Sequence, residues 1–295
     1  MTNKMPAARS AQLEKALQWA KDNEQIRAML LTSSMVNPDA PVDDFSDLDI
    51  EWVIADLPAF LADDSWLSHF GEVVSYIVEN EEAFDGRHAM RMVFYADYSK
   101  IDFKLYAVDK FVEDTLAEAL PEDWDVGYKV LLDKDGLTRH LKPPTYTSVL
   151  IRKPSEEHFQ WVLNNYWWDL TYVVKCLWRE ELFYARFMSE QVMRFEHLQH
   201  IIEWYIGMQH GWKVTTNKYG RLFKQYLSPE LWQRVEATFA GADMQDNWRA
   251  LEAYAALGRE LGMAIAGGLG YHYPAKLDEQ VTRYIETVKQ MPPKQ

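Results

Sequence analysis

Residues 33–53 read SSMVNPDAPVDDFSDLDIEWV and contain two aspartates, Asp47 and Asp49, one residue apart. The acids alternate with Leu48 and Ile50, a pattern typical of a β-strand, so both carboxylates project from one face of it. Like charges repel, and no basic residue stands next to them in the sequence. A divalent cation would remove the repulsion, because Mg²⁺ prefers hard oxygen ligands and typically takes one or two carboxylates.

A third acid, Asp102, lies in the stretch KIDFKLYAV (100–108), which also has the pattern of a strand. If this strand pairs near the first, three carboxylates meet and form a site for metal-assisted phosphoryl or nucleotidyl transfer. The alternative is that these acids are exposed on an edge strand and bind nothing.

The remaining sequence predicts an α+β protein in two parts. Up to about residue 140 helical and strand patterns are mixed, and Leu141-Lys142-Pro143-Pro144 marks a boundary. Residues 155–290 have helical periodicity and many tryptophans. We therefore expect a mixed sheet with helices in residues 1–144 and an all-helical domain in residues 145–295. The predicted strands are 26–34, 47–55, 88–97 and 100–108, and a helix is predicted over 9–23.

Composition narrows the range of partners. The 295-residue chain is 48% hydrophobic and carries a formal net charge of −14, with 45 acids against 31 bases. This balance argues against nucleic-acid binding, which depends on basic patches. It fits either simple solubility or an acidic cleft for a polycationic ligand. The sequence contains no signal-peptide core and no run long enough for a membrane span, and Cys176 is its only cysteine, so we expect a cytoplasmic protein.

The order of these features resembles the nucleotidyltransferase superfamily, in which a small turn precedes an acid–apolar–acid–apolar strand. The segments KIDFKLY, WWDLTYVVKCLWREELFYARF, EWYIGMQHGWKVTTNKYGRLFKQYLSPELW and LGYHYP extend the likeness over nearly the whole chain. Together they resemble the aminoglycoside 6-adenylyltransferases, also called streptomycin adenylyltransferases. This resemblance implies transfer of AMP from ATP to a hydroxyl of an aminoglycoside, most of all streptomycin, and thereby antibiotic resistance.

The resemblance also implies roles for residues in the first domain. Asp47 and Asp49 would hold Mg²⁺, and Asp102 would be the general base and a further metal ligand. Ser33 and Ser34 would contact the ATP triphosphate. The family usually has Gly-Ser-Arg at the turn where this chain has Ser33-Ser34-Met35. Glycine lets a backbone approach a phosphate closely, so Ser33 is expected to crowd this site.

The second domain is expected to bind the acceptor. Over a predicted helix 169–187, Asp169 and Glu180 fall on one mainly apolar face. Buried unpaired charges are costly, so these acids either bind the guanidinium groups of the acceptor or pair with basic residues of the chain. Trp168 either stacks on the acceptor or belongs to the core. Lys218 and Lys224 either bind phosphate or are solvated.

Two other functions remain open from the sequence. The same chemistry could transfer AMP to a different small molecule or to a protein acceptor. The chain could also be a catalytically silent nucleotide-binding module, a reading that Ser33 and Met35 favour and the three acids oppose.

Overall fold

The acid–apolar strand occupies an interior position in a mixed sheet. The structure, a computed structural model, describes residues 5–38, 40–80 and 87–292, and within them six strands follow the order β3-β4-β5-β2-β1-β6. Strands β2 and β5 are parallel, and the other neighbouring strands are antiparallel. The strands are β1 (Ile26–Thr32), β2 (Leu48–Ile54), β3 (Val73–Glu79), β4 (His88–Tyr95), β5 (Lys100–Ala107) and β6 (Tyr128–Asp133).

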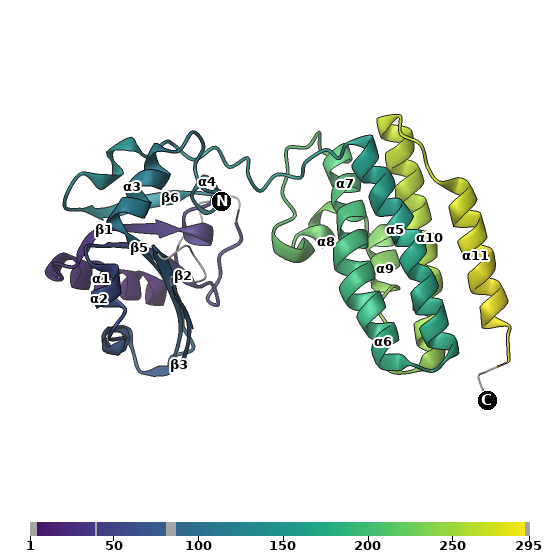
Figure 1. Cartoon of the computed structure of the whole chain (residues 1–295), viewed down its shortest axis with the longest axis horizontal. Helices are drawn as coiled ribbons and strands as arrows, with labels where there is room; N and C mark the ends of the chain where they lie inside the picture. Colours follow the sequence, from purple (N-terminus) through teal and green to yellow (C-terminus); the bar gives the residue numbers. More distant parts are fainter. Residues whose placement is uncertain (1–4, 39, 81–86, 293–295) are drawn as a thin grey trace. The chain divides into compact units, whose positions relative to one another are not determined.

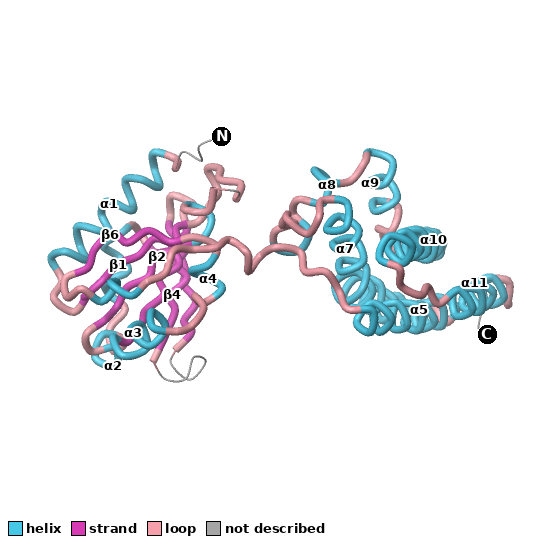
Figure 2. Tube along the Cα trace, turned by 90° about the horizontal axis from the view of Figure 1, so that it is seen from above, coloured by secondary structure: helices cyan, strands magenta, loops and turns pink. Residues whose placement is uncertain are grey.

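Helices cover both faces of this sheet (Figure 2). On one face, α1 (Ala7–Asp22) and the 3-10 segment η2 (Ser65–Phe70) pack on a core that includes Ile50, Trp52 and Phe103. On the other face, α3 (Val108–Leu116) and α4 (Glu122–Asp125) contribute Phe111 and Trp124 to a smaller core with Val53. The two-residue alternation of a strand explains this arrangement, because successive side chains of β2 serve different cores.

The C-terminal part contains only helices among its described residues, so the predicted α+β class, a mixed sheet followed by helices, is confirmed. Its α-helices are α5 (Glu156–Trp178), α6 (Leu182–Arg186), α7 (Gln199–Gln209), α8 (Phe223–Tyr226), α9 (Pro229–Glu236), α10 (Met244–Leu269) and α11 (Ala275–Lys289). The π-helix η5 (Phe187–Leu198) joins α6 to α7. Among the described residues, no helix is long and apolar enough to cross a membrane.

Two long helices, α5 and α10, form the centre of the helical part (Figure 1). Gly258 of α10 faces the ring of Tyr166 so closely that a Cβ atom there would overlap it. The Tyr166 hydroxyl donates a hydrogen bond to the backbone oxygen of Tyr254, 2.5 Å away. The absence of a side chain at Gly258 therefore leaves room for the tyrosine ring, whose hydroxyl is hydrogen-bonded.

The chain divides into two units, Met1–Val149 and Leu150–Gln295. At the end of the first unit, the buried carboxylate of Asp125 accepts bonds from the amides of Thr145, Thr147 and Ser148. This carboxylate fixes the last residues of the unit on α4. The boundary predicted at residues 144/145, and the roles assigned to the two domains, stay predictions.

The two edge strands of the sheet were not predicted. The first, β3, reads VVSYIVE, in which apolar residues do not alternate with polar ones. Its side chains Val74, Tyr76, Ile77 and Val78 are all exposed. The second is β6, which pairs with β1 at the opposite edge of the sheet.

Candidate active site

The parallel pairing of β2 and β5 places two of the predicted carboxylates side by side. In its register Asp49 lies opposite Asp102, and Asp47 comes one residue before β2 begins. All three side chains are half-buried. The antiparallel neighbour β1 ends at Thr32, which lies opposite Asp49. The turn that follows β1 therefore starts beside the carboxylates.

The charges of the two acids at the start of β2 act on Asp102. Burial raises the pKa of Asp102 to about 6, and the negative charges of Asp49 and Asp47 add to the increase. Burial also raises the pKa of Asp47, against the opposing charges of Lys100 and Arg9. The ionised form of Asp102 is thus disfavoured by burial and by its two acidic neighbours, which is the environment that a bound cation relieves.

The donor set fits a hard divalent cation, because it offers only carboxylate oxygens, the ligands that Mg²⁺ prefers. Among the described residues, no group of three or more His, Cys, Asp or Glu side chains is already arranged as a metal cluster. The assignment of Asp47, Asp49 and Asp102 as metal ligands therefore depends on their register and mutual repulsion, and it stays a prediction.

Helix α1 fastens the two chain segments that lead into the carboxylates. The buried Arg9 donates to the backbone oxygens of Ser46 and Asp44, each at 3.0 Å, just before Asp47. Gln12, one helical turn on, donates to the hydroxyl of Ser99, just before β5. We did not predict either role. The available signal was the presence of two polar residues on the buried face of the helix, in line with Ala16.

The predicted triphosphate turn has a strained backbone. Ser33 has φ = +63°, a left-handed conformation that glycine adopts at little cost and other residues rarely adopt. Ser33, Ser34 and Met35 form the 3-10 turn η1 (Ser33–Met35), and the Ser33 carbonyl accepts bonds from the amides of Val36 and Asn37. Serine thus occupies the position where the resemblance leads one to expect glycine, in the backbone conformation that favours glycine.

Two more charged residues lie on the same face of the sheet as Asp49 and Asp102. Glu51 lies opposite Lys104 in the β2–β5 register. Burial raises the pKa of Glu51 to about 7, although the charge of Lys104 lowers it. Burial lowers the pKa of Lys104, but Glu51 and Asp123 outweigh it, and Asp49 also contributes to the net increase. The positive charge of Lys104 in turn lowers the pKa of Asp102.

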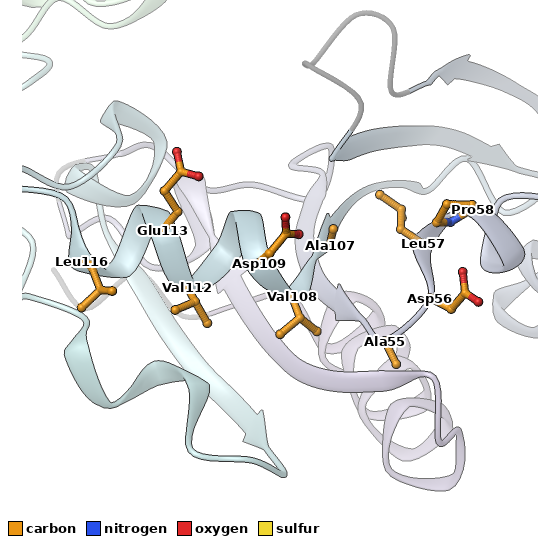
Figure 3. A pocket seen from close by; sticks show the side chains of 10 residues that line it. All are labelled: Ala55, Asp56, Leu57, Pro58, Ala107, Val108, Asp109, Val112, Glu113 and Leu116. Carbon is orange, nitrogen blue, oxygen red and sulfur yellow. The ribbon is translucent and has the colours of Figure 1, made fainter.

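An open groove lies at the other ends of these strands (Figure 3). It is lined by the residues that follow β2 and β5, including Leu57 and Val108, and by one side of α3. Two of its acids, Asp109 and Glu113, are both within ion-pair distance of Arg87. Because Asp49 and Asp102 lie near the starts of β2 and β5, this groove is separate from the candidate active site.

In the helical unit, Asp169 has a partner within the chain. Its carboxylate lies 2.8 Å from Nε2 of His197, a side chain that is almost fully buried. This contact supports the alternative in which the acid pairs internally. The neighbouring Trp168 is 60% exposed, so its ring does not belong to the core and its face is open to a ligand.

The predicted helix 169–187 is wrong, because α5 ends at Trp178 and α6 begins at Leu182. The amide of Glu181 donates a hydrogen bond to the backbone oxygen of Cys176, and the amide of Glu180 donates one to the backbone oxygen of Leu177. This pair of hydrogen bonds is the Schellman motif of a helix end. Glu180 has φ = +58° and is exposed. It is therefore not embedded in an apolar face, and no glycine in the sequence signals the break.

The two predicted phosphate-binding lysines are also exposed. Lys218 begins the 3-10 segment η6 (Lys218–Gly220), and Lys224 lies in the short helix α8. The ammonium of Lys224 lies 5.9 Å from the ring centre of Trp232. Both lysines, like Trp168, Asp169 and Glu180, belong to the second unit, whereas the three aspartates and the Ser33 turn belong to the first.

Comparison with known proteins identifies the family. The profile of the streptomycin adenylyltransferase family matches residues 8–288. The chain is 33% identical over 274 residues to an aminoglycoside 6-adenylyltransferase of Campylobacter jejuni, with 91% of each chain covered. It is 31% identical over 276 residues to one of Bacillus subtilis (strain 168), covering 92% of this chain and 94% of the relative. A crystal structure of an aminoglycoside 6-adenyltransferase from Bacillus subtilis aligns over 97% of this chain and 100% of its own, with a TM-score of 0.47 and 26% identity.

Proposed function

This chain belongs to the streptomycin adenylyltransferase family and is an adenylyltransferase, and we propose that it transfers AMP from ATP to a hydroxyl of an aminoglycoside, with streptomycin as the preferred acceptor. The observation that carries the chemistry is the β2–β5 register, which sets Asp49 beside Asp102 and Asp47 just before them. We further propose that the reaction confers antibiotic resistance and takes place in the cytoplasm.

Asp47, Asp49 and Asp102 are the proposed ligands of Mg²⁺. When bound, the ion neutralises charge on the triphosphate and assists departure of pyrophosphate. Nucleotide binding also involves the turn at Ser33 and Ser34, together with Lys218 and Lys224 from the second unit. Lys218 and Lys224 are exposed, and their ammonium groups would supply positive charge for phosphate.

Asp102 is the proposed general base. The acceptor hydroxyl oxygen forms a bond to the α-phosphorus as the bond from that phosphorus to pyrophosphate breaks, and the hydroxyl proton passes to the Asp102 carboxylate. Without a bound cation the pKa of Asp102 is raised to about 6, and a base is most effective when its pKa lies near the working pH. Burial, with the charges of Asp49 and Asp47, produces that value.

The acceptor is proposed to meet Trp168, Asp169 and Glu180. Trp168 and Glu180 are accessible, and a guanidinium group pairs well with a carboxylate and stacks well on an aromatic face. Asp169 already contacts His197, so a ligand would share that carboxylate rather than satisfy it alone. The net charge of −14 favours attraction of a polycationic acceptor over long range.

The test is pyrophosphate release with ATP, Mg²⁺ and a panel of aminoglycosides. Turnover is expected with streptomycin, and Asp49→Asn should abolish it without loss of fold, because the change removes a charge and keeps the shape. Asp102→Asn should lower kcat by at least about 100-fold, the lower size of a general-base contribution. Asp109→Asn, an acid in the separate groove, is the matched control and should keep wild-type turnover.

Three outcomes would change the proposal. ATP binding without turnover on any aminoglycoside would refute transfer to this class of acceptor. Turnover of Asp49→Asn within a few-fold of wild type would refute the metal assignment. Loss of ATP binding in Asp102→Asn would make this residue a ligand rather than the base.

A further inference from the structure

A buried ion pair lies directly behind the proposed metal ligands. In the parallel register Asp49 faces Asp102, and two residues further along the same strands Glu51 faces Lys104. Side chains two residues apart on a strand share a face, so both pairs project on the same side of the sheet. The sheet therefore places a carboxylate pair and an ammonium–carboxylate pair in consecutive rows.

Contacts from α4 hold this second pair in place. The Lys104 ammonium lies 3.6 Å from Oε1 of Glu51 and donates a hydrogen bond of 2.6 Å to Asp123. The indole of Trp124 donates to Oε2 of Glu51. Glu51 is 0% exposed and Lys104 only 8%. The lysine side chain is therefore held against the sheet by Glu51 and Asp123, and its charge lies one row behind the aspartates.

Stability alone does not account for a buried ion pair at this position. Buried pairs are often replaced by apolar residues with no loss of stability, because the desolvation of both ions offsets their attraction. A fixed positive charge has another effect here, since charges interact strongly when water is excluded. It offsets the repulsion between Asp49 and Asp102 whenever no cation lies between them.

We propose that Lys104, held by Glu51 and Asp123, is a positioning residue for the metal-binding carboxylates, a fixed countercharge that keeps them together without metal and thereby weakens their affinity for a divalent cation. This inference rests on the proposed role of Asp49 and Asp102 as metal ligands. Its consequence has a definite sign: removing the lysine charge makes the site more negative, so a divalent cation binds more tightly.

Two variants isolate this charge. Glu51→Gln keeps an oxygen that accepts from the Trp124 indole and leaves Lys104 with Asp123 as its partner. Adding Lys104→Met then removes the ammonium while keeping a similar length of side chain. Lys104→Met alone is not suitable, because it would leave a buried carboxylate without its cation. Glu51→Gln with Lys104→Gln repeats the comparison if the first double variant melts early.

The measurement is Mn²⁺ binding without nucleotide, followed by the electron paramagnetic resonance signal of free Mn²⁺. The double variant is expected to bind Mn²⁺ at least about threefold more tightly than Glu51→Gln alone, as the removal of a nearby positive charge predicts. Lys110→Met, which removes another paired lysine of the same unit, should leave the affinity unchanged. Circular dichroism melts establish that each variant is folded.

Equal Mn²⁺ affinities in Glu51→Gln and in the folded double variant, or weaker binding in the latter, would overturn the role of Lys104. Asp49→Asn separates this result from failure of the proposed function. If that variant loses Mn²⁺ binding while the other two bind alike, only the inference about Lys104 falls. If Asp49→Asn binds Mn²⁺ as wild type does, the metal site lies elsewhere and both proposals fall.

Discussion

Replacing Ser33 by glycine should stabilise the protein, although it deletes a side chain. A left-handed backbone costs an L-residue about 1–2 kcal/mol, and Ser33 has φ = +63°. Glycine avoids that cost but loses about 0.5–1 kcal/mol more conformational entropy on folding. The difference predicts a gain in the free energy of unfolding between about 0 and 1.5 kcal/mol. Each 1 kcal/mol raises the melting temperature of a domain of this size by about 2–4 °C.

The adjacent serine provides a matched control. Ser34 lies within the 3-10 turn and is not among the residues with positive φ, so Ser34→Gly should destabilise by about 0.5–1 kcal/mol. Ser33→Ala removes the hydroxyl and keeps the strained backbone, so it should show no gain. Urea unfolding of the three variants measures each change. A loss of stability in Ser33→Gly as large as that in Ser34→Gly would refute the argument from backbone strain.

Three further predictions concern the two units. Ser33→Gly with Met35→Arg should lower the Kd for ATP in calorimetric titrations, because the turn then has no Cβ in the way and gains a cation; an unchanged or higher Kd would mean that the present residues already suit the nucleotide. Burial raises the pKa of Asp125, but its hydrogen bonds from Thr145 and Ser148 outweigh burial and lower the pKa to about 2. The stabilisation by that carboxylate is therefore complete above its unfolded pKa of about 4 and is lost as the pH falls through about 2. Asp125→Asn should cost about 2 kcal/mol at pH 7 and progressively less below pH 4 in urea titrations, whereas a loss that does not depend on pH would contradict this assignment. Glu180→Gly should raise the melting temperature for the same reason as Ser33→Gly. Glu180→Gln should raise the KM for streptomycin more than the KM for ATP. If Glu180→Gln instead lowers the melting temperature and leaves the KM for streptomycin unchanged, Glu180 has a structural role alone.

The sequence predicted the features whose signal is local. Strands β1, β2, β4 and β5 and the helical half were found from apolar periodicity, as was the alternation that puts Asp47 and Asp49 on one face. Strand β3 was not predicted because its apolar and polar residues do not alternate, and most of its side chains are exposed. The break after α5 was not predicted because the residue with the left-handed backbone is Glu180 and not a glycine.

The surroundings of the carboxylates could not be predicted in the same way. That Glu51 faces Lys104 follows from a parallel pairing between strands far apart in the chain, and neither residue indicates its partner. Arg9 and Gln12 act on loops that precede β2 and β5, and only the folded helix α1 brings them there. These contacts depend on tertiary packing, which periodicity does not report.

The parallel pairing of β2 and β5 also affects when the site can form during synthesis. Asp49 and Asp102 come together only after the intervening chain, including β3 and β4, has been made and the loop between the two strands has closed. Loop closure of this kind costs entropy before its contacts repay it, so such pairings tend to form late. A nascent chain that has emerged only through β2 therefore holds its first two aspartates without their partner, and the proposed metal site cannot form until β5 has left the ribosome and joined the sheet.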